Sequence, residues 1–169
     1  MTNALLPIDP YLIKDNVFKL IGADWMLVTA GTLESFNTMT ASWAAMGELW
    51  NRRICISFVR PVRHTYQFME KADYYTLSFF EDKHRDALRL CGQKSGRDVD
   101  KIAATGLTPV ASDSGAVYFA EARLVMECKK IYIHDIDPAH FLDPKIDDEY
   151  PNKDYHRMYI GEVVRCLMR

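Results

Sequence analysis

Hydroxyl and amide side chains are concentrated in one short segment of the sequence. Asn37, Thr38, Thr40 and Ser42 alternate there with small or large apolar neighbours, and the segment ends at Trp43. A strand of this composition can offer side-chain hydroxyls and free backbone N–H groups to an anion or to a flat heterocycle. An ordinary threonine-rich edge strand has the same composition, because threonine favours strands in any case. The residue types alone leave both interpretations open.

Two further segments place positive charge where the chain is expected to turn. Arg60, Arg63 and Thr65 lie where a predicted strand gives way to a predicted helix. This combination suits a phosphate, since arginine supplies a fork of donors and the helix N-terminus adds positive potential. Lys94 and Ser95 form a cationic turn that could close over a ligand. A simple helix cap with solvated arginines, and a plain glycine turn, would explain the two segments as well.

A fourth segment carries a histidine and a glycine near the C-terminus. His156 precedes Gly161 by five residues in a stretch that is otherwise typical of a strand. A lone histidine on a strand is more often structural than catalytic. A glycine inside a strand indicates a bulge or the close approach of another group to the backbone.

The elements that must position these segments are predicted to be mainly strands. Apolar runs and period-two alternation predict strands at about residues 25–30, 37–45, 54–59, 74–79 and 155–167. Apolar residues at helical spacing predict short helices around 62–69 and 87–91. A third short helix is expected to be capped by Asp98 and ended by Gly106.

A long strand is expected from Ala116 onward, and its alternation changes phase. Apolar residues occupy even positions up to Cys128 and odd positions at Ile131 and Ile133. A strand that keeps its core face across such a change needs a bulge near 129–130. Long, bent strands allow a sheet to curl. The predicted fold is therefore a mainly β, closed or half-closed antiparallel barrel with short peripheral helices, in one domain of residues 1–169.

Composition excludes several classes of function. The chain has 169 residues and a net charge of −2, which argues against a nucleic-acid partner. It shows neither a signal peptide nor an apolar run of about 18 residues, so we expect a cytoplasmic protein without a membrane partner. The four cysteines lack metal-ligand spacing, and we expect buried, reduced thiols and no metal site. They are Cys55, Cys91, Cys128 and Cys166.

In this order and spacing, the four segments together resemble the flavin reductase-like family with the FMN-binding split-barrel fold. The resemblance runs from about Val17 to Val164. The resemblance rests on the segment 37–43, the Arg63-His64-Thr65 triplet before a helix, the segment 95–101 and the closing segment 156–163. The resemblance implies an antiparallel split barrel and a homodimer with FMN near the subunit interface.

The resemblance also implies a set of site residues. The expected FMN-binding residues are Asn37, Thr38, Met39, Thr40, Ala41, Ser42, Trp43, Arg60, Arg63, His64, Thr65, Lys94 and Ser95. Within this set, Thr40 and Ser42 would hydrogen-bond the flavin, while Arg63 and Thr65 would hold its phosphate. His156 would lie where nicotinamide stacks and would orient it. Trp25 departs from the family's pattern and alters one end of the expected pocket.

The aromatic side chains are expected to divide between core and site. Phe58, Tyr75, Phe79 and Tyr118 are predicted to fill the barrel core. Trp43 and Trp25 are the rings expected beside the flavin.

Three functions follow from these expectations. The first is an FMN-binding oxidoreductase that transfers a hydride from NAD(P)H to flavin, with a small molecule or a small protein as the electron acceptor. The second is a flavoredoxin-like electron-transfer protein that a protein partner reduces. The third is a split barrel that binds no flavin and serves as an interaction module.

Overall fold

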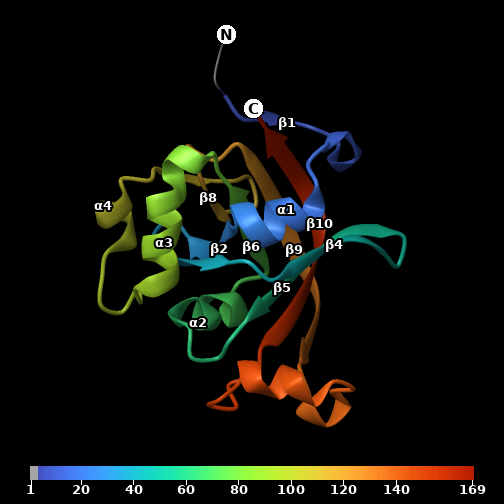
Figure 1. Cartoon of the computed structure of the whole chain (residues 1–169). Helices are drawn as coiled ribbons and strands as arrows, with labels where there is room; N and C mark the ends of the chain where they lie inside the picture. Colours follow the sequence, from blue (N-terminus) through green and yellow to red (C-terminus); the bar gives the residue numbers. More distant parts are fainter. Residues whose placement is uncertain (1–3) are drawn as a thin grey trace.

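The computed structural model describes residues 4–169, and antiparallel strands surrounded by short helices make up most of them (Figure 1). The strands are β1 (Leu6–Pro7), β2 (Met26–Thr32), β3 (Ser35–Ala41), β4 (Ala44–Leu49), β5 (Arg52–Val59), β6 (Tyr74–Phe79), β7 (Pro109–Ala111), β8 (Val117–Phe119), β9 (Leu124–Asp135) and β10 (Arg157–Met168). The α-helices are α1 (Val17–Lys19), α2 (His64–Lys71), α3 (Arg85–Gln93) and α4 (Lys101–Thr105). The other helical turns are η1 (Pro10–Leu12), η2 (Leu20–Asp24), η3 (Asp82–His84), η4 (Pro138–His140) and η5 (Pro144–Glu149).

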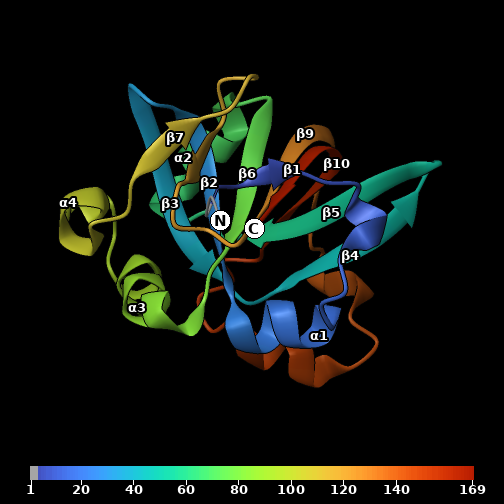
Figure 2. The ribbon, with the colours of Figure 1, turned by 90° about the horizontal axis from the view of Figure 1, so that it is seen from above.

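The main sheet curls but does not close. Its strands pair in the order β3-β2-β6-β9-β10-β5-β4, and β1 pairs with β10. β3 and β4 therefore form the two ends of the path, although only Ser42 and Trp43 separate them in the chain. Within residues 4–169, no ladder joins these two strands. Figure 2 shows them diverging from this shared corner, so the predicted split barrel is confirmed and its split lies between β3 and β4.

Two of the predicted strands are interrupted. The strand expected over 37–45 is present only up to Ala41, and a separate strand, β4, begins at Ala44. The expected strand from Ala116 breaks at a turn over 120–123, which separates β8 from β9.

The predicted bulge is present. Ile160 pairs with Tyr132 while Gly161 pairs with Lys130, so Ile131 is the extra residue in β9. The change of phase in the apolar pattern therefore located the bulge within one residue. A second irregularity leaves Val164 of β10 unpaired. Extra residues of this kind bend a strand and let the sheet curl.

The apolar core has two parts. One cluster lies inside the curled sheet and includes Met26, Val28, Tyr75 and Phe79. The other lies between the outer face of the sheet and α3, where Leu27 packs in one cluster with helix residues such as Leu88. On β5 the fully buried apolar residues are Cys55 and Val59. The predicted core positions of Tyr75 and Phe79 agree with their complete burial, whereas Phe58 and Tyr118 are only half-buried.

The helices gather around β2 and β3. α2 packs against β2 and β3, and α3 packs mainly against β3. α4 is capped by Asp100, whose Oδ1 accepts hydrogen bonds from the N–H groups of Ile102 and Ala103, each at 3.0 Å. The predicted cap, Asp98, is therefore wrong by two residues. The predicted end at Gly106 agrees with its left-handed φ of 69°.

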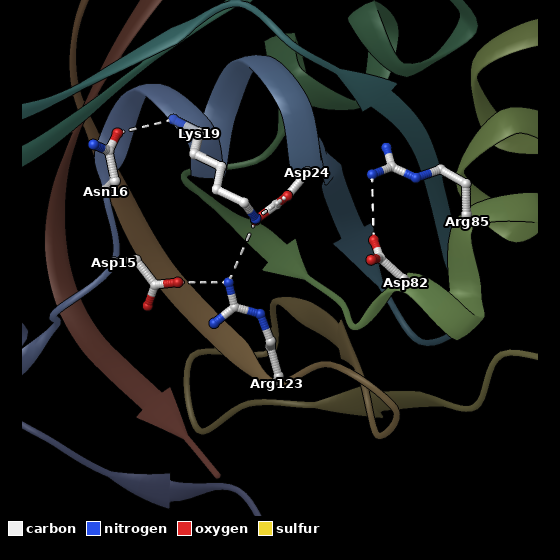
Figure 3. A network of polar contacts seen from close by, with 7 residues as sticks. All are labelled: Asp15, Asn16, Lys19, Asp24, Asp82, Arg85 and Arg123. Atoms are coloured by element: carbon white, nitrogen blue, oxygen red, sulfur yellow. Dashed lines mark hydrogen bonds and ion pairs between the residues drawn. The ribbon is translucent and has the colours of Figure 1, made fainter.

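An ionic network ties the N-terminal segment to the start of β9 (Figure 3). Arg123 donates to Asp15 at 2.6 Å and lies 3.8 Å from Asp24, which in turn pairs with Lys19 at 2.7 Å. Leu20 is buried in the inner core cluster. The network and this apolar contact hold α1 and η2 against the rest of the fold.

All four cysteines are buried and free, as expected. In residues 4–169, no helix is long and apolar enough to cross a membrane. The same residues contain no cluster of three or more potential metal ligands.

Candidate functional site

A pocket of about 200 Å³ opens at the corner between β3 and β4. It is lined by Met39, Thr40, Ala41, Ser42, Trp43, Phe58, Arg60, Arg63 and His156. Every lining residue except Phe58 was predicted from the sequence as a site residue. Residues far apart in the chain meet here because the two ends of the sheet share one corner. We call this cavity the split pocket.

Backbone donors are available at this corner. Ser42 and Trp43 lie between two strands, and within residues 4–169 neither of their N–H groups donates to another backbone group. The Trp43 side chain is 44% exposed at the pocket edge. Free N–H groups beside an exposed ring can recognise a flat molecule that carries carbonyl oxygens.

Most hydroxyls of the predicted segment are already used inside the protein. Thr38 and Thr29 share a buried hydrogen bond of 2.8 Å between their hydroxyls. The Thr40 hydroxyl donates to the Leu88 carbonyl oxygen of α3 at 2.5 Å. The Thr40 hydroxyl, which was expected to bond a ligand, therefore already bonds the backbone of α3. Ser42 is the hydroxyl of this group left with no such contact among the described residues.

A second polar contact lies behind β3. Asn37 donates to the fully buried Thr65 hydroxyl of α2 at 2.7 Å. A Cβ on Gly96 would come within 2.1 Å of Asn37 Oδ1 and 3.2 Å of His64 Cδ2, so only glycine fits there. The structure thus brings Asn37, His64 and Thr65 together with the 91–97 turn. The buried Nδ1 of His64 has no hydrogen-bond partner in the described part of the chain.

The two arginines of the split pocket have different partners. Arg63 donates to the Gly92 carbonyl oxygen at 2.9 Å and to that of Cys91 at 3.4 Å, at the C-terminal end of α3. Burial lowers the Arg63 pKa from its usual value. Arg60 instead donates to Asp154 at 3.1 Å, in the segment between β9 and β10.

Lys94 and Ser95 lie away from the pocket. The Lys94 side chain is exposed, and Ser95 Oγ accepts a hydrogen bond from the Arg97 N–H at 3.1 Å. Neither residue lines the split pocket. Within the turn, Gly96 approaches Asn37 of β3 and His64 of α2 instead.

His156 forms one wall of the split pocket. It is 8% exposed and packs against Trp43, with ring centroids 5.1 Å apart. Its Nδ1 is 2.8 Å from the Tyr150 hydroxyl. Burial, followed by the nearby Arg60, lowers the His156 pKa to about 4, so the imidazole is neutral at pH 7. The histidine therefore offers the pocket a neutral, hydrogen-bonding edge.

Sequence reasoning missed three residues of this region. Phe58 was expected in the core but lines the split pocket. Tyr150 was overlooked within an acidic segment, where nothing in the pattern signalled burial. Lys101 is 6% exposed and donates to the Thr38 and Cys91 carbonyl oxygens at 2.7 and 3.0 Å. The available signal was its place in the segment 95–101, one of those on which the family resemblance rests.

Trp25 does not line the split pocket, contrary to expectation. The Arg85 guanidinium lies 4.5 Å from the centre of its ring, and the ring packs on the outer core cluster. Its backbone has φ 67° and ψ 172°, a conformation that few residues other than glycine adopt.

The sequence was compared with families of known proteins. The flavin reductase-like domain matches residues 18–169. The chain belongs to this family. The resemblance seen in the four segments is thereby confirmed, and so is the mainly antiparallel split-barrel fold.

Several solved structures have a fold similar to that of this flavin reductase-like protein. The FMN-binding protein of Thermus thermophilus with bound p-hydroxybenzaldehyde is 20% identical, with a TM-score of 0.68, covering 96% of this chain and 82% of that one. The flavoredoxin of Desulfovibrio vulgaris (Miyazaki F) is 23% identical, with a TM-score of 0.67, covering 93% and 77%. The NADH:FAD oxidoreductase SgcE6 of Streptomyces globisporus C-1027 is 19% identical, with a TM-score of 0.65, covering 85% and 73%. No curated protein matches the sequence of this flavin reductase-like protein significantly.

Proposed function

We propose that this protein binds FMN at the split pocket and transfers a hydride from NAD(P)H to the flavin. The observation that carries the proposal is the convergence at one corner of free Ser42 and Trp43 N–H groups, the exposed Trp43 ring, Arg63 and a neutral His156. These groups come from three separate stretches of the chain. The matched family and the FMN-binding protein of similar fold support the same cofactor.

The donor set fits a flavin mononucleotide. The Ser42 and Trp43 N–H groups would hold the pyrimidine edge, where negative charge develops on reduction, and Trp43 would lie beside the ring system. Arg63 would bind the phosphate, because it lines the split pocket and is the N-cap residue of α2. When bound, FMN supplies the hydride-accepting chemistry itself. The protein then binds and orients the two partners.

A second copy of the chain would complete the site. A cavity of about 200 Å³ is small for a flavin, since pockets for ligands of that size span roughly 300–1,000 Å³. β4 is an edge strand, and the exposed Trp50 and Tyr132 rings lie 6.0 Å apart near its end. We propose that these rings contribute to a homodimer contact and that the partner walls the flavin.

A cytoplasmic location fits the chemistry of the cysteines. Four buried free thiols are what a reducing compartment maintains. We propose that location on this ground, and it agrees with a role in intracellular electron transfer.

A second candidate function is electron transfer without nicotinamide. A flavoredoxin-like protein would use the same flavin groups but receive its electrons from a protein partner. Two flavoredoxins among the structures of similar fold favour this alternative. The electron acceptor, a small molecule or a small protein, is common to both candidates.

The visible spectrum of the purified protein tests the proposal. We expect flavin absorption after incubation with FMN, and bleaching when NADH or NADPH is added without oxygen. Bound flavin that neither nucleotide bleaches, but dithionite does, would support the electron-transfer function. Protein that takes up no FMN in a titration would contradict both and leave a split barrel that serves as an interaction module.

A further inference from the structure

The segment between β9 and β10 folds against the split pocket. It contains η4 and η5 and lies beyond the lower end of the sheet in Figure 1. Arg60 anchors it, since its guanidinium donates to Asp154 at 3.1 Å and to the Glu149 carbonyl oxygen at 2.8 Å. Arg60, which lines the pocket, is thus bound to this segment. We call residues 136–155 the β9–β10 segment.

Tyr150 is the residue of the β9–β10 segment that reaches His156. It is 3% exposed, and its hydroxyl is 2.8 Å from His156 Nδ1. The Arg60 guanidinium lies 4.9 Å from the centre of its ring on one side, and Phe141 and Tyr155 pack around it with centroids 6.2 and 4.9 Å away. The ring therefore has little freedom, and its hydroxyl is held in one place.

The direction of this hydrogen bond follows from the hydroxyl's surroundings. Within residues 4–169, His156 Nδ1 is the one side-chain hydrogen-bond partner of the Tyr150 hydroxyl. If Nδ1 carried the proton, the buried phenol hydrogen would be left without an acceptor, which costs free energy. Burial raises the Tyr150 pKa and lowers that of His156, so both groups are neutral near pH 7. The favoured arrangement has Tyr150 donating to Nδ1 and the proton of His156 on Nε2.

We propose that Tyr150 is a positioning residue that holds His156 in the Nε2–H form, so that His156 offers a hydrogen-bond donor to the carboxamide oxygen of a bound nicotinamide. This inference rests on the proposed hydride transfer. Without Tyr150 the imidazole could rotate or change tautomer, and its Nε2 would then present an acceptor instead. A neutral donor orients an amide without competing for the flavin phosphate, as a charged side chain would.

Two tyrosine variants separate positioning from packing. Tyr150→Phe removes the hydroxyl at His156 and keeps the ring. Tyr155→Phe is the matched control, because its hydroxyl donates to Asp147 at 2.7 Å and its ring packs in the same aromatic cluster. Both variants are measured as FMN-loaded full-length protein, with NADH as the nucleotide.

The first readout is the tautomer of His156, measured by nitrogen NMR of the imidazole in the absence of nucleotide. We expect the Nε2–H form in the wild type and in Tyr155→Phe, and a mixture of tautomers in Tyr150→Phe. The Nδ1–H form in the wild type would overturn the proposal, even if Tyr150→Phe failed to fold. An unchanged tautomer in Tyr150→Phe would overturn it as well.

The second readout is steady-state kinetics. We expect Tyr150→Phe to raise the KM for NADH about five-fold, the effect of one weakened hydrogen bond, with kcat and FMN affinity nearly unchanged. Tyr155→Phe should leave all three values as they are. Equal changes in both variants would mean that Tyr150 only packs. If the wild type oxidises no NADH, the proposed hydride transfer is wrong, while the tautomer measurement still decides whether Tyr150 positions His156.

Discussion

At the scale of single residues, Arg63 and Lys101 stabilise the fold through the end of α3. Arg63 and Lys101 both donate to the Cys91 carbonyl oxygen near the end of α3. Positive charge is favourable there, because the C-terminal end of a helix carries partial negative charge and unpaired carbonyl groups. Burial lowers the Lys101 pKa to about 8, which shows how far this ammonium is removed from water. A phosphate binding here would therefore meet cations that α3 already holds in place.

Replacing Arg63 by alanine tests its role toward the phosphate. We expect FMN binding to weaken by about 1.5–3 kcal/mol, the value of a lost charge-assisted hydrogen bond, while riboflavin binding changes little. Fluorescence titration with both flavins measures this difference. The comparison cancels any loosening of α3, which affects both ligands alike. An equal loss for FMN and riboflavin would remove Arg63 from the phosphate site.

The buried His156 makes the stability of the protein depend on pH. Its pKa is about 4 in the folded protein and about 6.5 in an unfolded chain, so the unfolded chain binds more protons between these values. Stability from the neutral histidine is fully present above pH 6.5 and is lost as the pH falls to about 4, by up to about 3 kcal/mol. Urea unfolding of wild type and His156→Gln between pH 7 and 4 measures it. Parallel pH profiles for the two proteins would contradict the prediction.

At the scale of elements, the bulge and the corner shape the site. Gly161 follows the bulge in the β9–β10 ladder, and an added Cβ would lie 2.6 Å from Tyr75 Oη and 2.7 Å from Cys128 Cβ. Both expectations for this glycine, a bulge and a close approach, are thus confirmed. This irregularity in β10 at Gly161 lies between His156, which precedes the strand, and the C-terminal half of the strand. Ser42 and Trp43 lie between two strands and belong to neither, so within residues 4–169 their N–H groups donate to no other backbone group.

Gly161→Ala should destabilise the protein. We expect a loss of about 1–3 kcal/mol in the free energy of unfolding, because the methyl group overpacks a closed core. Gly47→Ala in β4 is the control, since no atom lies within 4 Å of its added Cβ. Adding Tyr75→Phe should restore part of the loss by removing the nearest oxygen. Thermal or urea unfolding of the three variants would refute the prediction if Gly161→Ala and Gly47→Ala behaved alike.

At the scale of the whole molecule, the sheet is open between β3 and β4. In residues 4–169, eight strands form the sheet and its two ends do not pair with each other, with a small cavity at their corner. At the far end of the β4–β5 hairpin, Trp50 and Asn51 both have positive φ values, of 54° and 56°. A hairpin turn of this kind favours glycine or asparagine, so the positive φ of Trp50 is unfavourable for a tryptophan. Trp50 is exposed as well as conformationally strained, which is what the proposed dimer contact would explain.

Trp50→Gly should separate folding from association. We expect an unchanged or slightly higher stability of the monomer, because glycine adopts the positive φ without strain. We expect dimerisation to weaken at least ten-fold, and FMN affinity to fall with it. Sedimentation equilibrium measures the first quantity and flavin titration the second. Leu142→Ser, at a fully exposed leucine, is the control, and equal association of the two variants would argue against this contact.

The sequence by itself was sufficient for the family, the strand-rich fold, the bulge and the identity of the lining residues. These features follow from local patterns: alternation, its change of phase, and the order of four short segments. Residue type and spacing therefore predicted most of the residues that meet at the corner between β3 and β4.

Only the tertiary structure decided how those residues are used. The Thr40 hydroxyl is committed to α3, Lys94 is exposed, and Phe58 leaves the core for the pocket. Tyr150 lies in a segment whose acidic composition suggests a solvated loop, yet it is buried against His156. Hydrogen-bond partners and burial depend on distant residues, such as Leu88 for Thr40, 48 positions away, and Glu149 for Arg60, 89 positions away, or on how a loop folds back on the sheet. A one-dimensional pattern carries no information on those distances, because the curl of the sheet sets them.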